Sequence, residues 1–162
     1  MICFAEERTM DIFTIIDYTK CTVDQLREIF ILRNDPEMRK WAENPVELTW
    51  ENHLRFVESL KNTHNSIYLA IYMKKELIGS YNLHLIQDTT WERGLFSSPN
   101  TQGKGLTSEW ENQILKSLSK DRFTKIVAEV KINNPRSIRY HEKMGFVETR
   151  RDEEYVFFEK VL

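Results

Sequence analysis

Apolar residues recur along the chain with helical spacing in some stretches and with strand-like alternation or continuity in others. Thr22 and Gln25 form a capping-box pattern, and the apolar positions behind them predict a helix that ends near Asn34. Thr49 is expected to cap a second helix. The buried stripe of that helix is predicted to contain Trp50, Leu54, Val57 and Leu60.

Strands are predicted wherever short apolar or alternating runs lie between polar turns. They are expected at residues 11–17, 66–73, 76–87, 90–97, 124–132, 146–151 and 154–161. The run 66–73 is apolar enough to be buried on both faces, and the three strands from 66 to 97 should form an antiparallel meander. Further helices are expected from the loop at 101–105 to about Lys120 and from Pro135 to Gly145.

This order of elements, β-α-α-β-β-β-α-β-α-β-β, predicts a mixed α/β fold. We expect a central, mostly antiparallel sheet of six to seven strands that is flanked by helices. With 162 residues, the chain is expected to form a single domain over residues 1–162.

Composition narrows the classes of function. The chain has 23 Lys and Arg against 25 Asp and Glu, a net charge of −2, which argues against a nucleic-acid partner. No run approaches the roughly 20 apolar residues of a membrane span, and residues 1–10 have no apolar signal core. The two cysteines, Cys3 and Cys21, lack metal-ligand spacing, which predicts a reducing, cytoplasmic location and no metal site.

Glycine is scarce, with five in the chain, and two of these lie in the loop before the helix that follows residue 105. A helix N-terminus presents free N–H groups and partial positive charge, and glycine lets the backbone bend around an anion. Gly103 and Gly105 therefore indicate a diphosphate-binding loop, with a plain tight turn as the alternative.

Two motifs together resemble the GNAT family of acetyltransferases, which transfer an acyl group from coenzyme A to an amine. Gln102-x-x-Gly105-x-Thr107 resembles the pyrophosphate loop of that family, with Thr107 where Gly or Ala is usual. Asn134-x-x-Ser137-x-x-x-His141-x-Lys143-x-Gly145-Phe146 resembles its second segment, with His141 where many members carry Tyr. The resemblance implies acetyl-CoA as cofactor. It assigns cofactor binding to Leu95, Phe96, Ser97, Gln102, Gly103, Lys104, Gly105, Leu106, Thr107, Asn134, Ser137 and Lys143.

The resemblance also suggests catalytic groups. His141 takes the position of the Tyr that protonates the departing thiolate, so it is either the acid or a packing residue. Glu92 lies where the family often has the group that accepts the amine proton; the alternative is an ordinary strand residue, and His84 is a second candidate. The backbone of Leu95 and Phe96 is expected to hold the thioester oxygen.

The N-terminal half resembles the GNAT branch that acetylates the 4-amino group of UDP-linked aminosugars on the way to flagellin glycans. That resemblance places Arg33, Trp41, His53 and His84 at the acceptor. A guanidinium suits a diphosphate and an indole suits a base or sugar face, although capping and salt bridging could explain Arg33 and His53.

We therefore expect an N-acetyltransferase that acts by direct transfer on a nucleotide-linked aminosugar, and a homodimer is plausible through an exposed strand edge. One alternative is an acetyltransferase for protein N-terminal or lysine amines, since ribosomal-protein acetyltransferases share a related arrangement. Another is a coenzyme A-binding module without catalysis.

Overall fold

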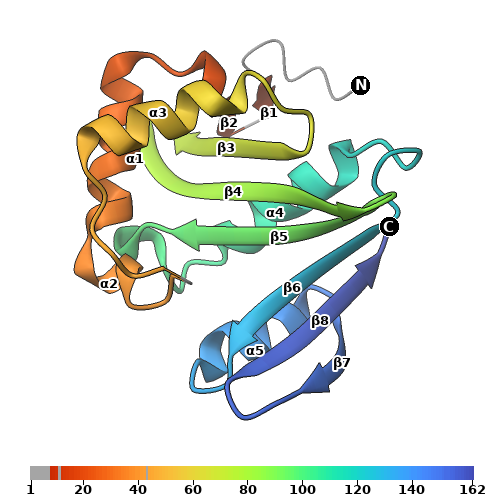
Figure 1. Cartoon of the computed structure of the whole chain (residues 1–162). Coiled ribbons are helices and arrows are strands. Elements are labelled where there is room, and N and C mark those ends of the chain that lie inside the picture. Colours follow the sequence, from red (N-terminus) through yellow and green to blue (C-terminus); the bar gives the residue numbers. More distant parts are fainter. Residues whose placement is uncertain (1–7, 11, 43) are drawn as a thin grey trace.

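One mixed sheet runs through the molecule (Figure 1). The computed structural model describes residues 8–10, 12–42 and 44–162. The strands are β1 (Arg8–Met10), β2 (Phe13–Asp17), β3 (Ser66–Met73), β4 (Glu76–Gln87), β5 (Thr90–Ser97), β6 (Lys125–Lys131), β7 (Val147–Arg151) and β8 (Tyr155–Val161). In the described part they form one eight-stranded sheet in the order β1-β2-β3-β4-β5-β6-β8-β7. Its pairs are antiparallel except β5–β6, so the predicted mixed, mostly antiparallel architecture is confirmed.

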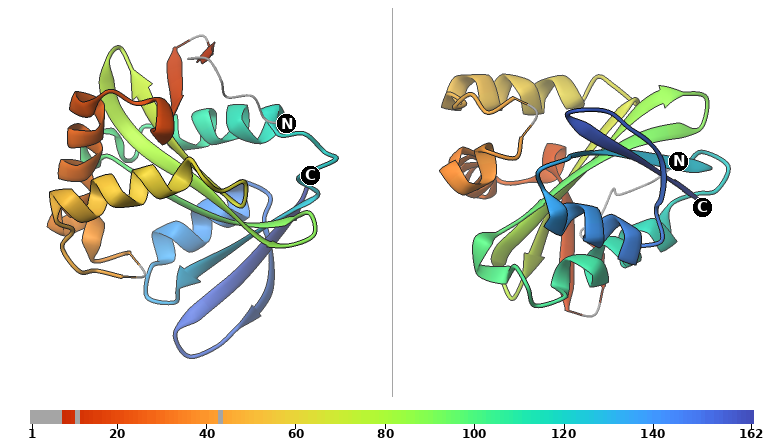
Figure 2. Two further views of the ribbon diagram at one scale, coloured as in Figure 1. Left: turned by 45° about the horizontal axis from the view of Figure 1, so that its top comes forward. Right: turned by 90° about the horizontal axis from the view of Figure 1, so that it is seen from below.

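Helices cover both faces of the sheet, with α1 to α3 on one face and α4 and α5 on the other (Figure 2). They are α1 (Val23–Asn34), α2 (Pro36–Arg39), α3 (Trp50–Leu60), α4 (Leu106–Ser117) and α5 (Pro135–Lys143), with the 3-10 turns η1 (Tyr18–Lys20) and η2 (Pro99–Thr101). The predicted capping box at Thr22 and Gln25 is present, and Thr49 caps α3.

The central strand β3 takes part in two cores. Leu69 and Ile71 face the larger core beneath α4, whereas Ala70 and Tyr72 face the smaller core beneath α1 and α3. Successive side chains of a strand point to opposite faces, so a strand between two cores needs apolar residues at every position. The middle of 66–73 is buried on both faces as predicted.

The pairing of β5 with β6 is short and determines where the site lies. These strands pair in parallel only from Thr90 to Glu92, and beyond that point they diverge (Figure 1). The N–H of Ser98 donates to the carbonyl of Ile78 on β4. Because hydrogen bonding alternates along an antiparallel ladder, the N–H of Phe96 is also directed toward β4 and that of Leu95 toward the opening.

Several local expectations are corrected. Leu54 is exposed, and His53 takes its place on the buried face of α3 with Val57 and Leu60. The helix expected to reach about Lys120 ends at Ser117. The first predicted strand begins at Phe13, and Asp11 lies outside the described residues. β1 and the four-residue α2 were not predicted.

Candidate active site

A cavity of about 350 Å³ lies where β5 and β6 diverge, and residues from both halves of the chain line it. Nine predicted site residues meet there: Arg33, Trp41, His84, Glu92, Leu95, Phe96, Asn134, Ser137 and His141. Its lining also includes residues that were not predicted, among them Tyr68, Asn82, Arg93, Glu129, Lys131, Tyr140 and Tyr155. The divergence of two strands therefore joins the candidate acceptor residues to the candidate acyl-transfer residues.

The loop before α4 has the backbone that the phosphate-loop prediction requires. Gly103 and Gly105 have φ values of 78° and 75°, which L-residues with a side chain rarely adopt. A Cβ at either position would meet nothing within 4 Å, so the loop is open to a ligand. Gly105 is the N-cap of α4 and provides no capping side chain, which leaves the first N–H groups of a 12-residue helix available.

Side chains connect this loop to β5 and α5. The hydroxyl groups of Ser97 and Thr107 lie 2.6 Å apart, so Thr107 fits at the place where the family usually has Gly or Ala. Arg136 donates to the Gln102 side chain at 2.7 Å and brings a cation to the loop. Lys104 is exposed and Leu106 is partly buried against the larger core.

The second motif organises α5. The Asn134 side chain accepts from the N–H of Ser137 at 3.1 Å and so caps the helix, while Gly145 follows the helix with φ of 79°. Both residue types are thus explained by helix ends. Lys143 is exposed at the opposite end of α5 from Asn134 and does not line the cavity, so a cofactor contact for it has no support in this geometry.

His141 is buried, with only 3% of its surface exposed. Its Nδ1 lies 2.7 Å from the carbonyl oxygen of Ser137, and its ring stacks on Phe158 with a centroid separation of 5.1 Å. Nε2 is buried without a hydrogen-bond partner. Burial, and secondarily the charge of Arg93, lower the pKa of His141 to about 3, so the imidazole is neutral near pH 7. The geometry favours a packing role over the acid role suggested by the resemblance.

A buried ion pair lies next to His141. Arg93 Nε is 2.9 Å from Glu111 Oε1, and the two side chains are 3% and 0% exposed. The hydroxyl of Tyr140 donates to the other oxygen of Glu111, and the guanidinium of Arg93 lies over the ring of Phe146. Burial and then Glu111 raise the pKa of Tyr140, so this phenol keeps its proton. The network gives the wall of the cavity a fixed polar structure.

Across the cavity, polar side chains form a row on one face of the sheet. Ser66 pairs with His84 across β3 and β4, and His84 pairs with Glu92 across β4 and β5. The Ser66 hydroxyl lies 2.8 Å from His84 Nδ1, and the Tyr68 hydroxyl lies 2.8 Å from His84 Nε2. Cross-strand neighbours approach closely, so the two predicted proton acceptors, Glu92 and His84, are adjacent.

His53 does not reach the cavity, which corrects its assignment to the acceptor. Its Nε2 lies 3.1 Å from the carbonyl oxygen of Leu26, and its ring packs against Phe30 and Trp50. Burial lowers its pKa, as expected for a neutral ring that joins α3 to α1. An imidazole on a helical face looked like a ligand from sequence but serves packing.

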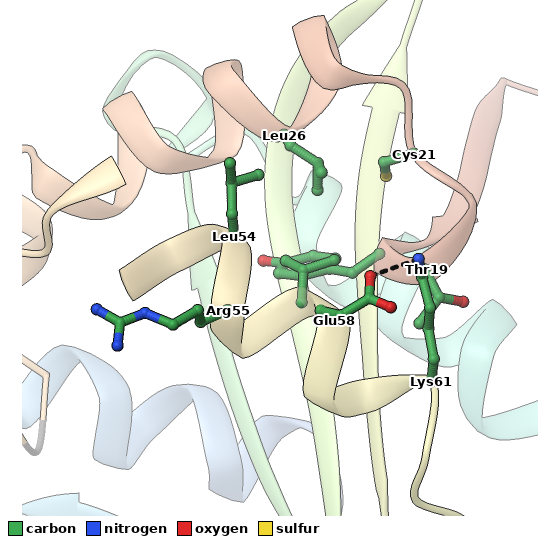
Figure 3. A pocket seen from close by; sticks show the side chains of 9 residues that line it. Thr19, Cys21, Leu26, Leu54, Arg55, Glu58 and Lys61 are labelled. Atoms are coloured by element: carbon green, nitrogen blue, oxygen red, sulfur yellow. Dashed lines mark hydrogen bonds and ion pairs between the residues drawn. The ribbon is translucent and has the colours of Figure 1, made fainter. Parts of the chain in front are cut away.

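A second cavity, of about 410 Å³, lies between η1, α1 and α3 (Figure 3). It contains Cys21, whose Sγ donates to the carbonyl oxygen of Asp17 at 3.5 Å. Burial raises the pKa of this thiol to about 12, which makes it a poor nucleophile, and it does not line the cavity between β5 and β6. Cys3 lies outside the described residues.

Residues 8–10, 12–42 and 44–162 lack two features that other classes of site would need. No group of three or more His, Cys, Asp or Glu side chains there could hold a metal ion. None of the helices in the same ranges has the length and apolar character needed to cross a membrane.

Sequence reasoning missed Arg93, Lys131 and Arg136. A signal existed for Arg93, because it shares the strand parity of the buried Trp91 and a charge at such a position requires a partner. Nothing local marks Lys131 or Arg136, since their partners are 34 to 91 residues away in the chain.

Comparisons with known proteins show the family of the chain. The family described as acetyltransferase (GNAT) domain matches residues 19–147. Two proteins of Campylobacter jejuni named acetyltransferase PseH are 26% identical over 89 residues and 21% identical over 143 residues. The first match spans 55% of this chain and 56% of that protein, and the second spans 87% and 88%.

Solved structures show the same fold. N-acetyltransferase PseH from Campylobacter jejuni in complex with acetyl coenzyme A has a TM-score of 0.73 at 19% identity, covering 92% of this chain and 98% of that chain. Spermidine N-acetyltransferase from Vibrio cholerae in complex with CoA and spermine has a TM-score of 0.81 at 20% identity, covering 94% and 96%. Because the family match covers most of the sequence, the predicted enzyme class and acyl donor are confirmed: the chain belongs to the GNAT acetyltransferases, which use acetyl-CoA.

Proposed function

We propose that this acetyltransferase acts on the 4-amino group of a UDP-linked aminosugar. The observation that carries the proposal is the meeting of Arg33 and Trp41 with Glu92 and His84 in one cavity. A guanidinium can bind a diphosphate through two hydrogen bonds, and an indole can stack on a base or a sugar. The two relatives named acetyltransferase PseH support the transfer of an acetyl group, and the choice of acceptor rests on the residues that line the cavity.

The loop before α4 fits the diphosphate of coenzyme A for two reasons. No neighbouring atom crowds its two glycines, and no side chain caps the N-terminus of the helix. Acetyl-CoA supplies an activated thioester. In our proposal Gly103, Gly105 and the backbone around them bind phosphate oxygens, with the Arg136 cation beside them. The N–H of Leu95, directed toward the opening between the strands, donates to the thioester oxygen as negative charge develops there.

The acceptor amine must lose a proton before or as it attacks. Glu92 is the proposed acceptor of this proton, either directly or through one water molecule, and its neighbour His84 is the second candidate. The hydroxyl groups of Ser66 and Tyr68 hold both nitrogens of the His84 ring, which fixes the orientation of the imidazole. Acetyl transfer is then direct, since Cys21 is a poor nucleophile and lies in the other cavity.

The leaving thiol requires little help. A thiol similar to Cys has a pKa of roughly 8.5, so it can depart as a thiolate near neutral pH. Neither ring nitrogen of His141 suits it as an acid, because Nδ1 bonds the Ser137 carbonyl and the pKa of the ring is about 3. We therefore propose that His141 packs α5 against β8 and does not donate a proton.

A cationic amine without a nucleotide is the second candidate acceptor. Glu92 and Glu129 both line the cavity, and two carboxylates suit a peptide N-terminus, a lysine or a polyamine. Such an acceptor would not need Arg33 for diphosphate binding. Arg33→Ala should therefore abolish turnover of a nucleotide sugar and leave turnover of a cationic amine largely intact.

The test is thiol release from acetyl-CoA with a UDP-4-amino-4,6-dideoxy sugar as acceptor, compared with peptide amines and spermidine. Turnover selective for the sugar, with loss in Arg33→Ala, supports the proposal. Turnover of peptides or spermidine without turnover of the sugar overturns it in favour of the second candidate. Binding of acetyl-CoA should be measured in parallel, so that an unfolded preparation is recognised.

A further inference from the structure

We propose that Lys131 is a positioning residue for the acceptor, since its ammonium group holds the segment that carries Trp41 against the cavity. The inference rests on the proposed function for its kinetic part only. The segment, residues 35–42, contains α2 and contributes Trp41 and Ala42 to the cavity lining. Trp41 is 43% exposed, so its own packing does not fix it.

The segment has little stability of its own. α2 has four residues and buries none of them, and a helix this short is not stable in isolation. The residue before the segment, Asn34, is bonded to Leu48 beyond it. The Asn34 side chain accepts from the N–H of Leu48 at 2.9 Å and donates to the carbonyl of the same residue at 3.0 Å. Arg39 also donates to the carbonyl oxygens of Asn34 and Pro45, at 3.1 and 3.5 Å, but these contacts end before Trp41, which needs a separate one.

Lys131 supplies that contact. Its Nζ donates to the carbonyl oxygens of Lys40 and Ala42, at 3.3 Å each, and these two residues flank Trp41. Lys40 is also the C-cap of α2, where carbonyl groups carry partial negative charge and a cation is favourable. One ammonium group therefore caps the helix and fixes both sides of the indole-bearing residue.

The backbone of Lys131 is held by regular secondary structure. Lys131 pairs with Tyr155 across β6 and β8, and its carbonyl accepts from the N–H of Asn134, the residue that caps α5. Lys131 thus connects the segment that carries Trp41 to α5, the helix that contains the second family motif. These contacts join residues that lie 89 and 91 positions apart in the chain, so no local pattern in the sequence indicates them.

The first experiment compares hydrogen exchange and kinetics of Lys131→Met, Lys131→Arg and wild type. The amides of Trp41 and Ala42 bond to the carbonyls of Met38 and Arg39, so their exchange reports whether the segment is held. Lys125→Met is the matched control, because Lys125 lies on the same face of β6 as Lys131 and its Nζ forms an ion pair with Glu159 instead of contacting the segment. The kinetic measurement uses the UDP-4-amino-4,6-dideoxy sugar as the acceptor probe.

In Lys131→Met we expect faster exchange at Trp41 and Ala42 and a KM for the acceptor raised by about tenfold, because two hydrogen bonds are lost. The kcat and the KM for acetyl-CoA should stay as in wild type, which is the pattern of lost binding without lost transition-state stabilisation. Lys131→Arg should keep wild-type exchange and kinetics, as should Lys125→Met.

Unchanged exchange in Lys131→Met would overturn the inference, whatever the acceptor. Faster exchange with an unchanged acceptor KM would show that the contact holds the segment but does not position an acceptor, and would equally overturn it. Failure of the proposed function would appear differently, as absence of sugar turnover in wild type. The exchange measurement then still decides whether Lys131 holds the segment.

Discussion

Arg93 and Glu111 form an ion pair with 2.9 Å between Nε and Oε1, and both side chains are almost completely buried. The pair joins β5 to α4 next to the opening between β5 and β6, with Arg93 lining the cavity. From α5, the hydroxyl of Tyr140 donates a hydrogen bond to the other carboxylate oxygen of Glu111. Three elements that carry the acyl-transfer half of the site are thus connected through one carboxylate.

Glu111→Gln should lower the free energy of unfolding by about 3 kcal/mol or more, because it leaves the buried Arg93 charge without its partner. Urea denaturation followed by circular dichroism measures the change. Glu109→Gln, at an exposed position in the first turn of the same helix, is the control and should have little effect. Replacing both members, in Arg93→Met/Glu111→Leu, should restore most of the loss. A Glu111→Gln protein as stable as the control would contradict the structural role.

The stability of the enzyme should fall as the pH decreases below about 6.5, in part because of His141. The pKa of His141 is about 3 in the folded chain and ordinarily about 6.5 in an unfolded chain. Between these values the unfolded state binds a proton that the folded state does not, so its stabilising contribution is complete above pH 6.5 and is lost toward pH 3. The slope from this group is at most about 1.4 kcal/mol per pH unit.

His141→Phe should remove this part of the slope, as measured by urea denaturation at several pH values between 7 and 4.5. The comparison with wild type isolates His141, since His53, whose pKa is also lowered by burial, is present in both. His64→Asn, at an exposed site, should keep the wild-type slope. Identical slopes in wild type and His141→Phe would show that His141 is protonated in the folded chain.

His141→Phe should also leave the pH dependence of acetyl transfer unchanged between pH 6 and 8. The neutral imidazole carries no acid proton to lose in that range, and Phe preserves the ring that packs on Phe158 and Phe146. Steady-state rates with acetyl-CoA and the nucleotide sugar provide the profile. A basic limb, in which the rate falls as the pH rises, that is present in wild type and missing in the variant would restore His141 as a catalytic acid.

Gly105→Ala should weaken coenzyme A binding by about tenfold, because an L-residue disfavours the positive φ and the free loop then relaxes to a backbone that no longer presents its N–H groups to the phosphates. Calorimetric titration with coenzyme A measures the affinity. Gly145→Ala is the control, because Gly145 has φ of 79° but follows α5 and is not part of the loop before α4; a Cβ there would also lie 3.0 Å from Lys160 Nζ. It should lose stability and keep its affinity. Equal weakening in both variants would mean that the effect is general strain and not the phosphate loop.

The order of the longer elements and both family motifs were predictable because they depend on local signals, whereas the three-residue β1 and the four-residue α2 were not predicted. The caps at Thr22, Thr49 and Asn134 and the positive φ at Gly103, Gly105 and Gly145 each follow from residue type and spacing. The environment of His141 was not predictable, since its burial comes from Phe158 and its low pKa partly from Arg93. The same holds for His53, where a carbonyl of α1 determines the role of an imidazole on α3. Residue type indicated chemistry, but tertiary contacts decided it.

Cys3→Ala/Cys21→Ala should retain wild-type turnover if transfer is direct. The raised pKa of the Cys21 thiol, about 12, keeps the thiol protonated at pH 7. Its Sγ donates a hydrogen bond to the carbonyl oxygen of Asp17, and Cys21 lines the cavity of Figure 3. Steady-state thiol release measures turnover, and rapid mixing would reveal a burst from any acyl-enzyme. A burst in wild type that is lost in the double variant would establish a covalent intermediate.

Glu92→Gln should lower kcat by about 100-fold or more near pH 7 and should leave the KM for acetyl-CoA unchanged, because Glu92 is the proposed acceptor of the amine proton. Its rate should recover as pH rises, when a growing share of the acceptor amine is already neutral. Glu129 also lines the cavity, and Glu129→Gln tests whether a carboxylate there matters by charge alone. We expect it to change the KM of the acceptor more than kcat. If Glu92→Gln kept wild-type activity while His84→Asn lost it, the proton acceptor would be His84, held by Ser66 and Tyr68.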